Sequence, residues 1–156
     1  MHPSPVQLAP ASVDEVLATG LLDQLDADLR QRYPGEPVNG IDPEPFRAAG
    51  GYFVLARFHT RPVGCGAFRP YQAEAGTVEI KRIFVHPELR GRGLARRVME
   101  ALEAEARRRG FTHAILETAG GQPEAIGLYR SCGYAEIPAF EPYVHSVRSM
   151  CFGKAL

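Results

Sequence analysis

The sequence has no surplus of charge, no long apolar run and few cysteines. Its 156 residues include 18 Lys and Arg against 18 Asp and Glu, so it lacks the basic surplus on which extended nucleic-acid binding depends. No stretch approaches the roughly 18 apolar residues of a membrane-spanning helix. The three cysteines, Cys65, Cys132 and Cys151, form no CxxC pair, which argues against a disulfide framework and a cysteine-based zinc site. Neither nucleic acid nor membrane is an expected partner.

The first fifteen residues (MHPSPVQLAPASVDE) lack the basic start and the apolar core of a secretory signal. We therefore expect a reducing, cytoplasmic location. The hydrophobic fraction of 45% excludes wholesale disorder, and the length is close to the commonest size of one domain. We expect residues 1–156 to form a single domain.

The balanced total conceals an uneven distribution of charge. Residues 1–78 carry a net charge of −3, and residues 79–156 carry +3. The window 81–97 alone carries +5, because its basic residues face a single acid, Glu88. A local basic cluster in a neutral protein favours one small anionic ligand over a long polyanion, although a solvated surface of arginines gives the same pattern.

Apolar spacing and Gly/Pro positions predict an α/β (α+β) fold with helices packed on a mixed sheet. Spacings of three and four predict a helix over 13–33, which Gly20 can split in two. The Pro- and Gly-rich stretch 33–43 predicts a long loop, a common form of binding lid. Two further helices are expected at 93–109 and 123–132. The expected strands are 51–58, 62–69, 77–85, 112–117 and 144–152.

A glycine-rich segment connects the strand that ends at Val85 to the helix that follows. The first amide N–H groups of a helix have no internal partners and carry the positive end of its dipole. Gly91 and Gly93 keep side chains away from those amides, and arginines at 90, 92, 96 and 97 add charge. A dinucleotide fingerprint would need a small residue at Arg96, and no P-loop string exists. The segment predicts a pyrophosphate site, and a plain glycine turn with solubilising arginines is the alternative.

Two motifs in this order resemble the GNAT superfamily of acyl-CoA-dependent N-acetyltransferases. Its signature, Arg/Gln-x-x-Gly-x-Gly/Ala after a strand, is met by Arg90, Gly93 and Ala95. The block 125–134 (AIGLYRSCGY) looks like its A-x-x-L-Y-x-x-x-G-F/Y motif. The resemblance spans roughly residues 50–153. It implies a mixed β-sheet flanked by helices, with splayed central parallel strands.

The resemblance also implies where acetyl-CoA binds. The co-substrate would lie in the V-shaped split between strands 79–85 and 112–117, with its pantetheine arm paired to backbone groups near Phe84 and Val85. The amides of residues 91–95 would hold the pyrophosphate. Gln122 stands where many members have an Asn that meets the CoA arm. The predicted cofactor-binding residues are Phe84, Val85, Arg90, Gly91, Arg92, Gly93, Leu94, Ala95 and Gln122.

Acetyl transfer to an amine requires a neutral amine and a donor for the departing thiolate. Tyr129 is the candidate acid, because a phenol can donate a hydrogen bond or a proton to a thiolate; a core aromatic is the alternative role. Glu79 is the candidate base, since it resembles the strand glutamate that serves as base in some GNAT enzymes. A strand charge paired with Lys81 or Arg82 is the alternative. Water chains serve instead in other members, and the loop 33–46 could supply a carboxylate.

No metal is assigned, because His86, His113 and His145 lack metal-ligand spacing. The predicted function is transfer of an acetyl group from acetyl-CoA to a primary amine, of a small molecule, in a ternary complex. Acetylation of a protein lysine or N-terminus and a non-catalytic acyl-CoA sensor are the alternatives. The resemblance also admits a homodimer. Candidate acceptor-pocket residues are Tyr33, Glu36, Asp42, Phe46, Phe140, Glu141 and Tyr143. Asp42 and Glu44 are the carboxylates that the loop 33–46 could supply as a base.

Overall fold

The computed structural model describes residues 5–38, 40–47, 50–120 and 122–156. They form a seven-stranded mixed sheet with the order β1-β2-β3-β4-β5-β7-β6. β4 and β5 pair in parallel, and the other neighbours are antiparallel. The strands are β1 (Val6–Ala11), β2 (Tyr52–Phe58), β3 (Arg61–Pro70), β4 (Thr77–Val85), β5 (His113–Ala119), β6 (Ala135–Ile137) and β7 (Ser149–Ala155).

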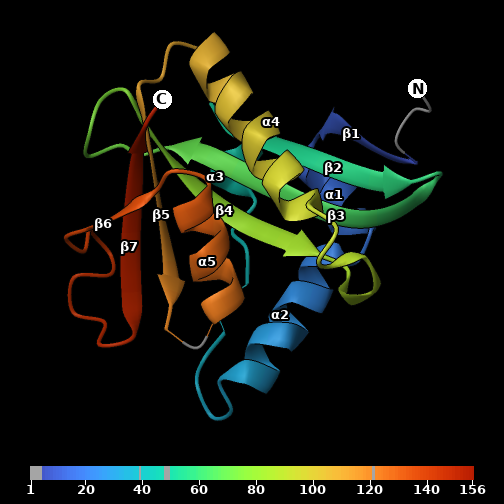
Figure 1. Ribbon diagram of the computed structural model, residues 1–156, viewed down its shortest axis with the longest axis horizontal. Coiled ribbons are helices and arrows are strands. Elements are labelled where there is room, and N and C mark those ends of the chain that lie inside the picture. Colours follow the sequence, from blue (N-terminus) through green and yellow to red (C-terminus); the bar gives the residue numbers. More distant parts are fainter. Residues whose placement is uncertain (1–4, 39, 48–49, 121) are drawn as a thin grey trace.

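Helices cover both faces of this sheet (Figure 1). Residues of α4 (Leu94–Arg108) and α5 (Pro123–Ser131) pack into one apolar cluster on one face. Residues of α1 (Val13–Ala18), α2 (Leu21–Arg32) and the short α3 (Glu44–Arg47) pack into a second cluster on the other face. A 3₁₀ turn, Pro87–Leu89, follows β4. The predicted mixed sheet flanked by helices is confirmed.

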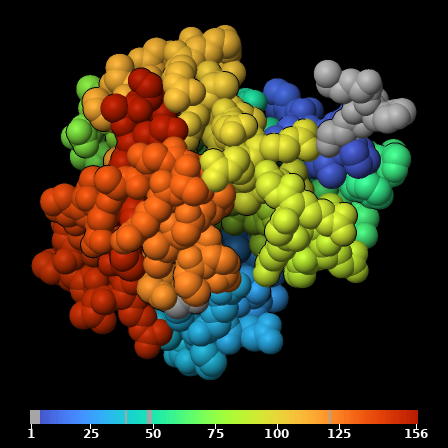
Figure 2. Space-filling model, in the orientation of Figure 1, coloured from blue at the N-terminus to red at the C-terminus, as the bar shows by residue number. Residues whose placement is uncertain are grey.

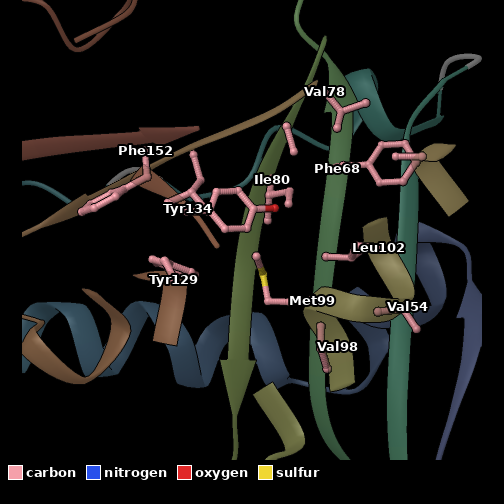
Figure 3. Packing of buried hydrophobic residues seen from close by; sticks show 13 residues of the cluster. Val54, Phe68, Val78, Ile80, Val98, Met99, Leu102, Tyr129, Tyr134 and Phe152 are labelled. Atoms are coloured by element: carbon pink, nitrogen blue, oxygen red, sulfur yellow. The ribbon is translucent and has the colours of Figure 1, made fainter. Parts of the chain in front are cut away.

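The first cluster holds α4 and α5 against β4, β5 and β7. Figure 3 shows Met99 of α4, Tyr129 of α5 and Phe152 of β7 gathered near Ile80 of β4. Tyr134 belongs to the same cluster, and its hydroxyl donates a hydrogen bond to the buried carboxylate of Glu103 at 2.9 Å. Burial of these apolar side chains fixes α5 beside the open part of the sheet.

Three expectations about the strands were wrong. β1 was not predicted, because Pro5 and Pro10 obscure its alternation; Pro10 is tolerated since β1 lies at the edge of the sheet. The last strand begins at Ser149 and not at residue 144, and residues 144–148 form a loop with Val147 fully exposed. The short edge strand β6 was missed as well. Gly20, at φ +78°, does split the first helix.

β4 and β5 are joined over only a short length. Their pairing runs from Thr77 opposite His113 to Glu79 opposite Ile115. Beyond these residues the two strands separate, and Figure 1 shows their arrows pointing apart with α5 beside the gap. The predicted splay of the central parallel strands is confirmed.

A β-bulge in β4 lies beside this split. Lys81 pairs with Ala67 and Phe84 pairs with Cys65, so two residues of β4 face the single residue Gly66 of β3. One of the two, Arg82, has φ +61°. Its guanidinium reaches the carboxylate of Asp26 in α2 at 3.4 Å. The bulge therefore redirects the end of β4 and connects it to α2.

Within the described ranges, no helix has both the length and the apolar character needed to cross a bilayer.

Candidate active site

A cavity of about 450 Å³ lies where β4 and β5 separate. Its walls come from α2, the end of β4, the glycine-rich segment and α5. Figure 2 shows the surface hollowed between the orange α5 and the yellow-green segment that leads into α4. The lining includes eight of the nine predicted cofactor-binding residues: Phe84, Val85, Arg90, Gly91, Gly93, Leu94, Ala95 and Gln122. The exposed Arg92 is the ninth, and it does not line the cavity.

The glycines of this segment are required by backbone conformation. Gly91 has φ +76° and Gly93, the N-cap of α4, has φ +77°. A Cβ at either position would meet no atom within 4 Å, so the limit is the left-handed conformation itself. No side chain of the described residues caps the start of α4. Its first amides therefore remain available to an anion in the cavity.

The arginines of this segment do not all point to one place. Arg90 lines the cavity, and its Nε donates to the carbonyl of Val85 at 2.9 Å. Arg96 also lines the cavity and donates to the carbonyl of Ser131 at 3.4 Å. Arg97 instead donates to the carbonyl of Val6 at 3.0 Å. The expectation that four arginines surround one point was therefore wrong for Arg97, which joins α4 to β1.

Tyr129 lies at the inner wall of the cavity. It is 8% exposed and packs against the rings of Tyr134 and Phe152, so it is a core aromatic and also a cavity residue. Burial, together with the nearby charge of Glu117, raises the pKa of Tyr129 to about 12. The phenol therefore stays protonated near neutral pH and can donate a hydrogen bond.

Glu79 lies in β4 at the last residue pair before the split. It is 1% exposed. Arg69 donates to its Oε1 at 3.2 Å, and Lys81 and Tyr143 donate to its Oε2 at 3.4 and 3.3 Å. Both oxygens thus have cationic or phenolic partners. The alternative role of Glu79 was that of a strand carboxylate paired with Lys81 or Arg82. The pairing with Lys81 is present, but the carboxylate is buried and its other cationic partner is Arg69.

A second carboxylate, Glu117, lies on the separated part of β5. Its Oε1 accepts a hydrogen bond from Ser149 at 3.3 Å. Burial raises the pKa of Glu117, and the hydrogen bond from Ser149 and the positive charge of Lys81 oppose this effect only in part. Glu117 was not among the residues predicted from the sequence. The available signal was a lone acid in a mostly apolar strand, HAILETA.

The candidate acceptor residues divide among several places. Tyr33 lines a second cavity of about 560 Å³, and Glu141 lines a third of about 420 Å³. Phe46 was wrongly expected to line a pocket, because it is buried against Phe53 at a ring distance of 5.1 Å. Asp42 accepts a hydrogen bond from the amide of Glu44. Tyr143 contacts Glu79, Phe140 packs on Tyr143, and Glu36 pairs with Arg148.

The expected loop after α2 is present, and Asn39 within it lies outside the described residues. The described ranges hold no group of three His, Cys, Asp or Glu side chains that could hold a metal ion.

The cavity brings together residues of both sequence motifs: Arg90, Gly93 and Ala95 of the first, and Ala125, Leu128 and Tyr129 of the second. Residues 19–134 match the acetyltransferase (GNAT) family, and the chain belongs to this family.

Individual relatives agree with this assignment. The chain is 37% identical over 136 residues to an IAA acetyltransferase of Azospirillum brasilense, which covers 87% of this chain and 88% of the relative. A solved protein of Klebsiella pneumoniae, assigned as an acyl-CoA N-acyltransferase, is 28% identical with a TM-score of 0.79 and covers 97% of both chains. The fold is shared with a GNAT acetyltransferase of Elizabethkingia anophelis solved with acetyl-CoA bound, at 15% identity and a TM-score of 0.69, over 99% of this chain and 100% of the other.

Substitution of Gly93 tests the proposed phosphate-binding turn. We expect Gly93→Ala to lower the free energy of unfolding by about 1–2 kcal/mol, because a left-handed φ is costly for a residue with a Cβ. The KM for acetyl-CoA should rise as the amides turn away. Gly127→Ala is the matched control, since Gly127 lies within α5 with open space around it, and a helical alanine there should not destabilise. Reduced stability with an unchanged KM would contradict the proposed role of the turn.

Proposed function

We propose that the protein transfers the acetyl group of acetyl-CoA to a primary amine of a small molecule, by direct attack in a ternary complex. The observation that carries this proposal is the single cavity that joins the uncapped start of α4 to the split between β4 and β5, with Tyr129 on its wall.

The cavity residues fit the parts of acetyl-CoA in order. The amides of Gly91, Gly93 and Leu94 would hold the pyrophosphate, with Arg90 and Arg96 adding positive charge. Beyond Glu79, β4 has lost its pairing to β5, so backbone groups at Phe84 and Val85 are available to the amides of the pantetheine arm. Gln122 lines the same cavity.

Tyr129 would act on the thioester sulfur. Its pKa of about 12 lies above the pKa of about 8.5 of a simple thiol, so complete proton transfer to the thiolate is uphill. A hydrogen bond that strengthens as charge develops on the sulfur is the better description of its role.

Two carboxylates are candidates to accept the proton of the amine. Glu79 is the one predicted from sequence, and its oxygens are already engaged by Arg69, Lys81 and Tyr143. Glu117 has a hydrogen bond from Ser149 and lies on the separated strand. The contacts favour Glu117, because a base needs a free lone pair directed at the substrate or an intervening water.

A small acceptor is favoured over a protein acceptor by the ion pairs around the site. Arg32 of α2 pairs with Glu124 of α5 at 2.5 Å, and Arg148 pairs with Glu36 of the loop at 2.8 Å. These contacts join segments on opposite sides of the cavities. A long peptide would need them to open, whereas a small molecule would not.

The proposed function is tested by release of the CoA thiol from acetyl-CoA. Purified protein is assayed against amino acids, polyamines, aminoglycosides and unstructured peptides. Release with a small amine and not with peptides is expected. Release of the CoA thiol with peptides alone would support the first alternative, acetylation of a protein lysine or N-terminus. Binding of acetyl-CoA without thiol release for any amine would support the second, a non-catalytic acyl-CoA sensor.

The single domain over 1–156 and the cytoplasmic location are also proposals. The cytoplasmic location accords with the free thiols of Cys65, Cys132 and Cys151, because a reducing compartment keeps cysteines as thiols.

A further inference from the structure

The second cavity adjoins the proposed site of acetyl transfer. It is lined by residues from the end of α2, the end of β5 and the start of β7: Arg32, Tyr33, Gly120, Val147, Arg148, Ser149 and Met150. Arg32 lines the first cavity as well, so the two cavities share this side chain as a wall. Ser149 donates to Glu117, so a molecule in the second cavity lies beside that carboxylate.

The hydrogen-bond donors that line the second cavity favour an anionic ligand. Arg148 is a cation, and its guanidinium lies over the ring of Tyr33 at 5.9 Å. The hydroxyl of Tyr33 is buried and has no hydrogen-bond partner within the described part of the chain. A buried polar group without a partner is unfavourable, and a native structure seldom retains one without reason. A guanidinium stacked over the ring of a phenol, with the phenol hydroxyl still unpartnered, suits an oxyanion, above all a carboxylate.

The acidic residues nearby do not cancel this preference. Glu36 holds Arg148, but the two side chains are 42% and 56% exposed, and exposed ion pairs are weak enough to exchange for a ligand carboxylate. Asp28 and Glu124 are engaged with Arg32. Glu117 does not line this cavity, but it accepts a hydrogen bond from Ser149, which does. A ligand with its anion at Arg148 and its amine at Ser149 therefore has that amine next to the Glu117 carboxylate.

We propose that the acceptor is an amino acid, whose carboxylate is bound by Arg148 and the hydroxyl of Tyr33 and whose amine faces Glu117. This inference rests on the proposed acetyltransferase function and names its substrate class. Val147 and Met150 provide apolar surface for the side chain of the amino acid. The nitrogen of the neutral amine forms its bond to the acetyl carbon and gives one proton to Glu117. The carbon–sulfur bond breaks, and the CoA thiolate leaves with a hydrogen bond from Tyr129.

Paired acceptors test this assignment. Common amino acids are compared with the amines formed by removing their carboxyl group, for example phenylalanine with phenethylamine, in the CoA-release assay. We expect kcat/KM to be at least tenfold higher for the amino acid, because a bidentate or charge-assisted contact is lost in the amine. Equal use of both members of each pair would overturn the assignment.

Two variants locate the contact. Arg148→Gln and Tyr33→Phe should each raise the KM for the amino acid about tenfold or more, leaving the KM for acetyl-CoA and the rate with the decarboxylated amine unchanged. Arg61→Gln is the matched control: Arg61 is as exposed as Arg148, pairs with Glu88 and lines none of the three cavities. An equal loss in Arg61→Gln, or no loss in Arg148→Gln, would overturn the assignment.

A binding measurement separates this inference from the proposed function. The melting temperature of the protein with CoA is measured with and without each free amino acid. A rise that disappears in Arg148→Gln supports the carboxylate site even if no acetyl transfer occurs. Acetyl transfer to amines without any such rise and without preference for amino acids would overturn the carboxylate site and leave the acetyltransferase intact.

Discussion

Tyr129→Phe is expected to lower kcat about 100-fold and to leave the KM for acetyl-CoA nearly unchanged. The substitution removes one hydroxyl and keeps the ring that packs against Tyr134 and Phe152. Because the pKa of Tyr129 is raised to about 12, the hydroxyl is protonated at every pH at which the assay is practical. A donor that acts on charge developing in the transition state contributes a factor of about 10² to 10³. Steady-state kinetics with varied acetyl-CoA provide the measurement.

Tyr134→Phe is the control for this prediction. The hydroxyl of Tyr134 donates to the buried Glu103, outside the lining of the main cavity. Its removal should reduce the free energy of unfolding by about 1–3 kcal/mol, since a buried acceptor loses a partner, and should leave kcat within a factor of about two. If Tyr129→Phe retains full kcat, another group assists the thiolate.

Glu117→Gln is expected to lower kcat/KM for the amine about 100-fold near neutral pH. General bases contribute a factor of about 10² to 10⁴. The active form is the carboxylate, and burial raises the pKa of Glu117, so wild-type activity should fall as the pH drops through that raised pKa. In the variant this dependence disappears. The loss should be greatest where Glu117 is ionised and the amine is still protonated in solution. It should shrink at lower pH, where the wild-type carboxylate is itself protonated, and at high pH, where an alkylamine with a pKa of about 10.4 begins to lose its proton in solution.

Glu79→Gln distinguishes the two carboxylates. If Glu79 mainly positions its neighbours, its replacement leaves Arg69 and Lys81 without their buried counter-charge. The protein is then destabilised, and the pH profile of the remaining activity keeps its wild-type shape. If Glu79→Gln removes the acidic limb of the profile and Glu117→Gln keeps it, Glu79 is the base. If both variants keep that limb, the proton leaves by another path, such as a chain of waters.

Local motifs were sufficient to predict which residues of the glycine-rich segment and of α5 gather around one cavity. These residues lie close together within each motif, and the positive φ of Gly91 and Gly93 is a local property of the turn. The end of β4 and the start of α4 also belong to one short stretch of chain. Here the backbone chemistry of each short segment largely determines its structure.

Contacts between distant segments were not predictable in the same way. Arg97 reaches Val6 only because β1, an edge strand obscured by its prolines, lies beside β2. Glu117 gains its environment from Ser149 and Lys81, which belong to other strands. The second cavity combines the end of α2 with residues just before β7. Each of these features depends on the order of strands in the sheet, which spacing along the sequence does not reveal.

The short pairing of β4 with β5 has a consequence for the stability of the protein. Three residue pairs join the meander β1–β4 to the unit of β5, β7 and β6, so the sheet is continuous but weakly connected at its centre. A ligand whose amides pair with the exposed edge of β4 acts there as an additional strand. Its binding energy then enters the folding equilibrium, and at a concentration 100 times its Kd it adds about 2.7 kcal/mol to the free energy of unfolding. The proposed binding of acetyl-CoA along β4 therefore predicts a thermal stability that rises with the concentration of the co-substrate.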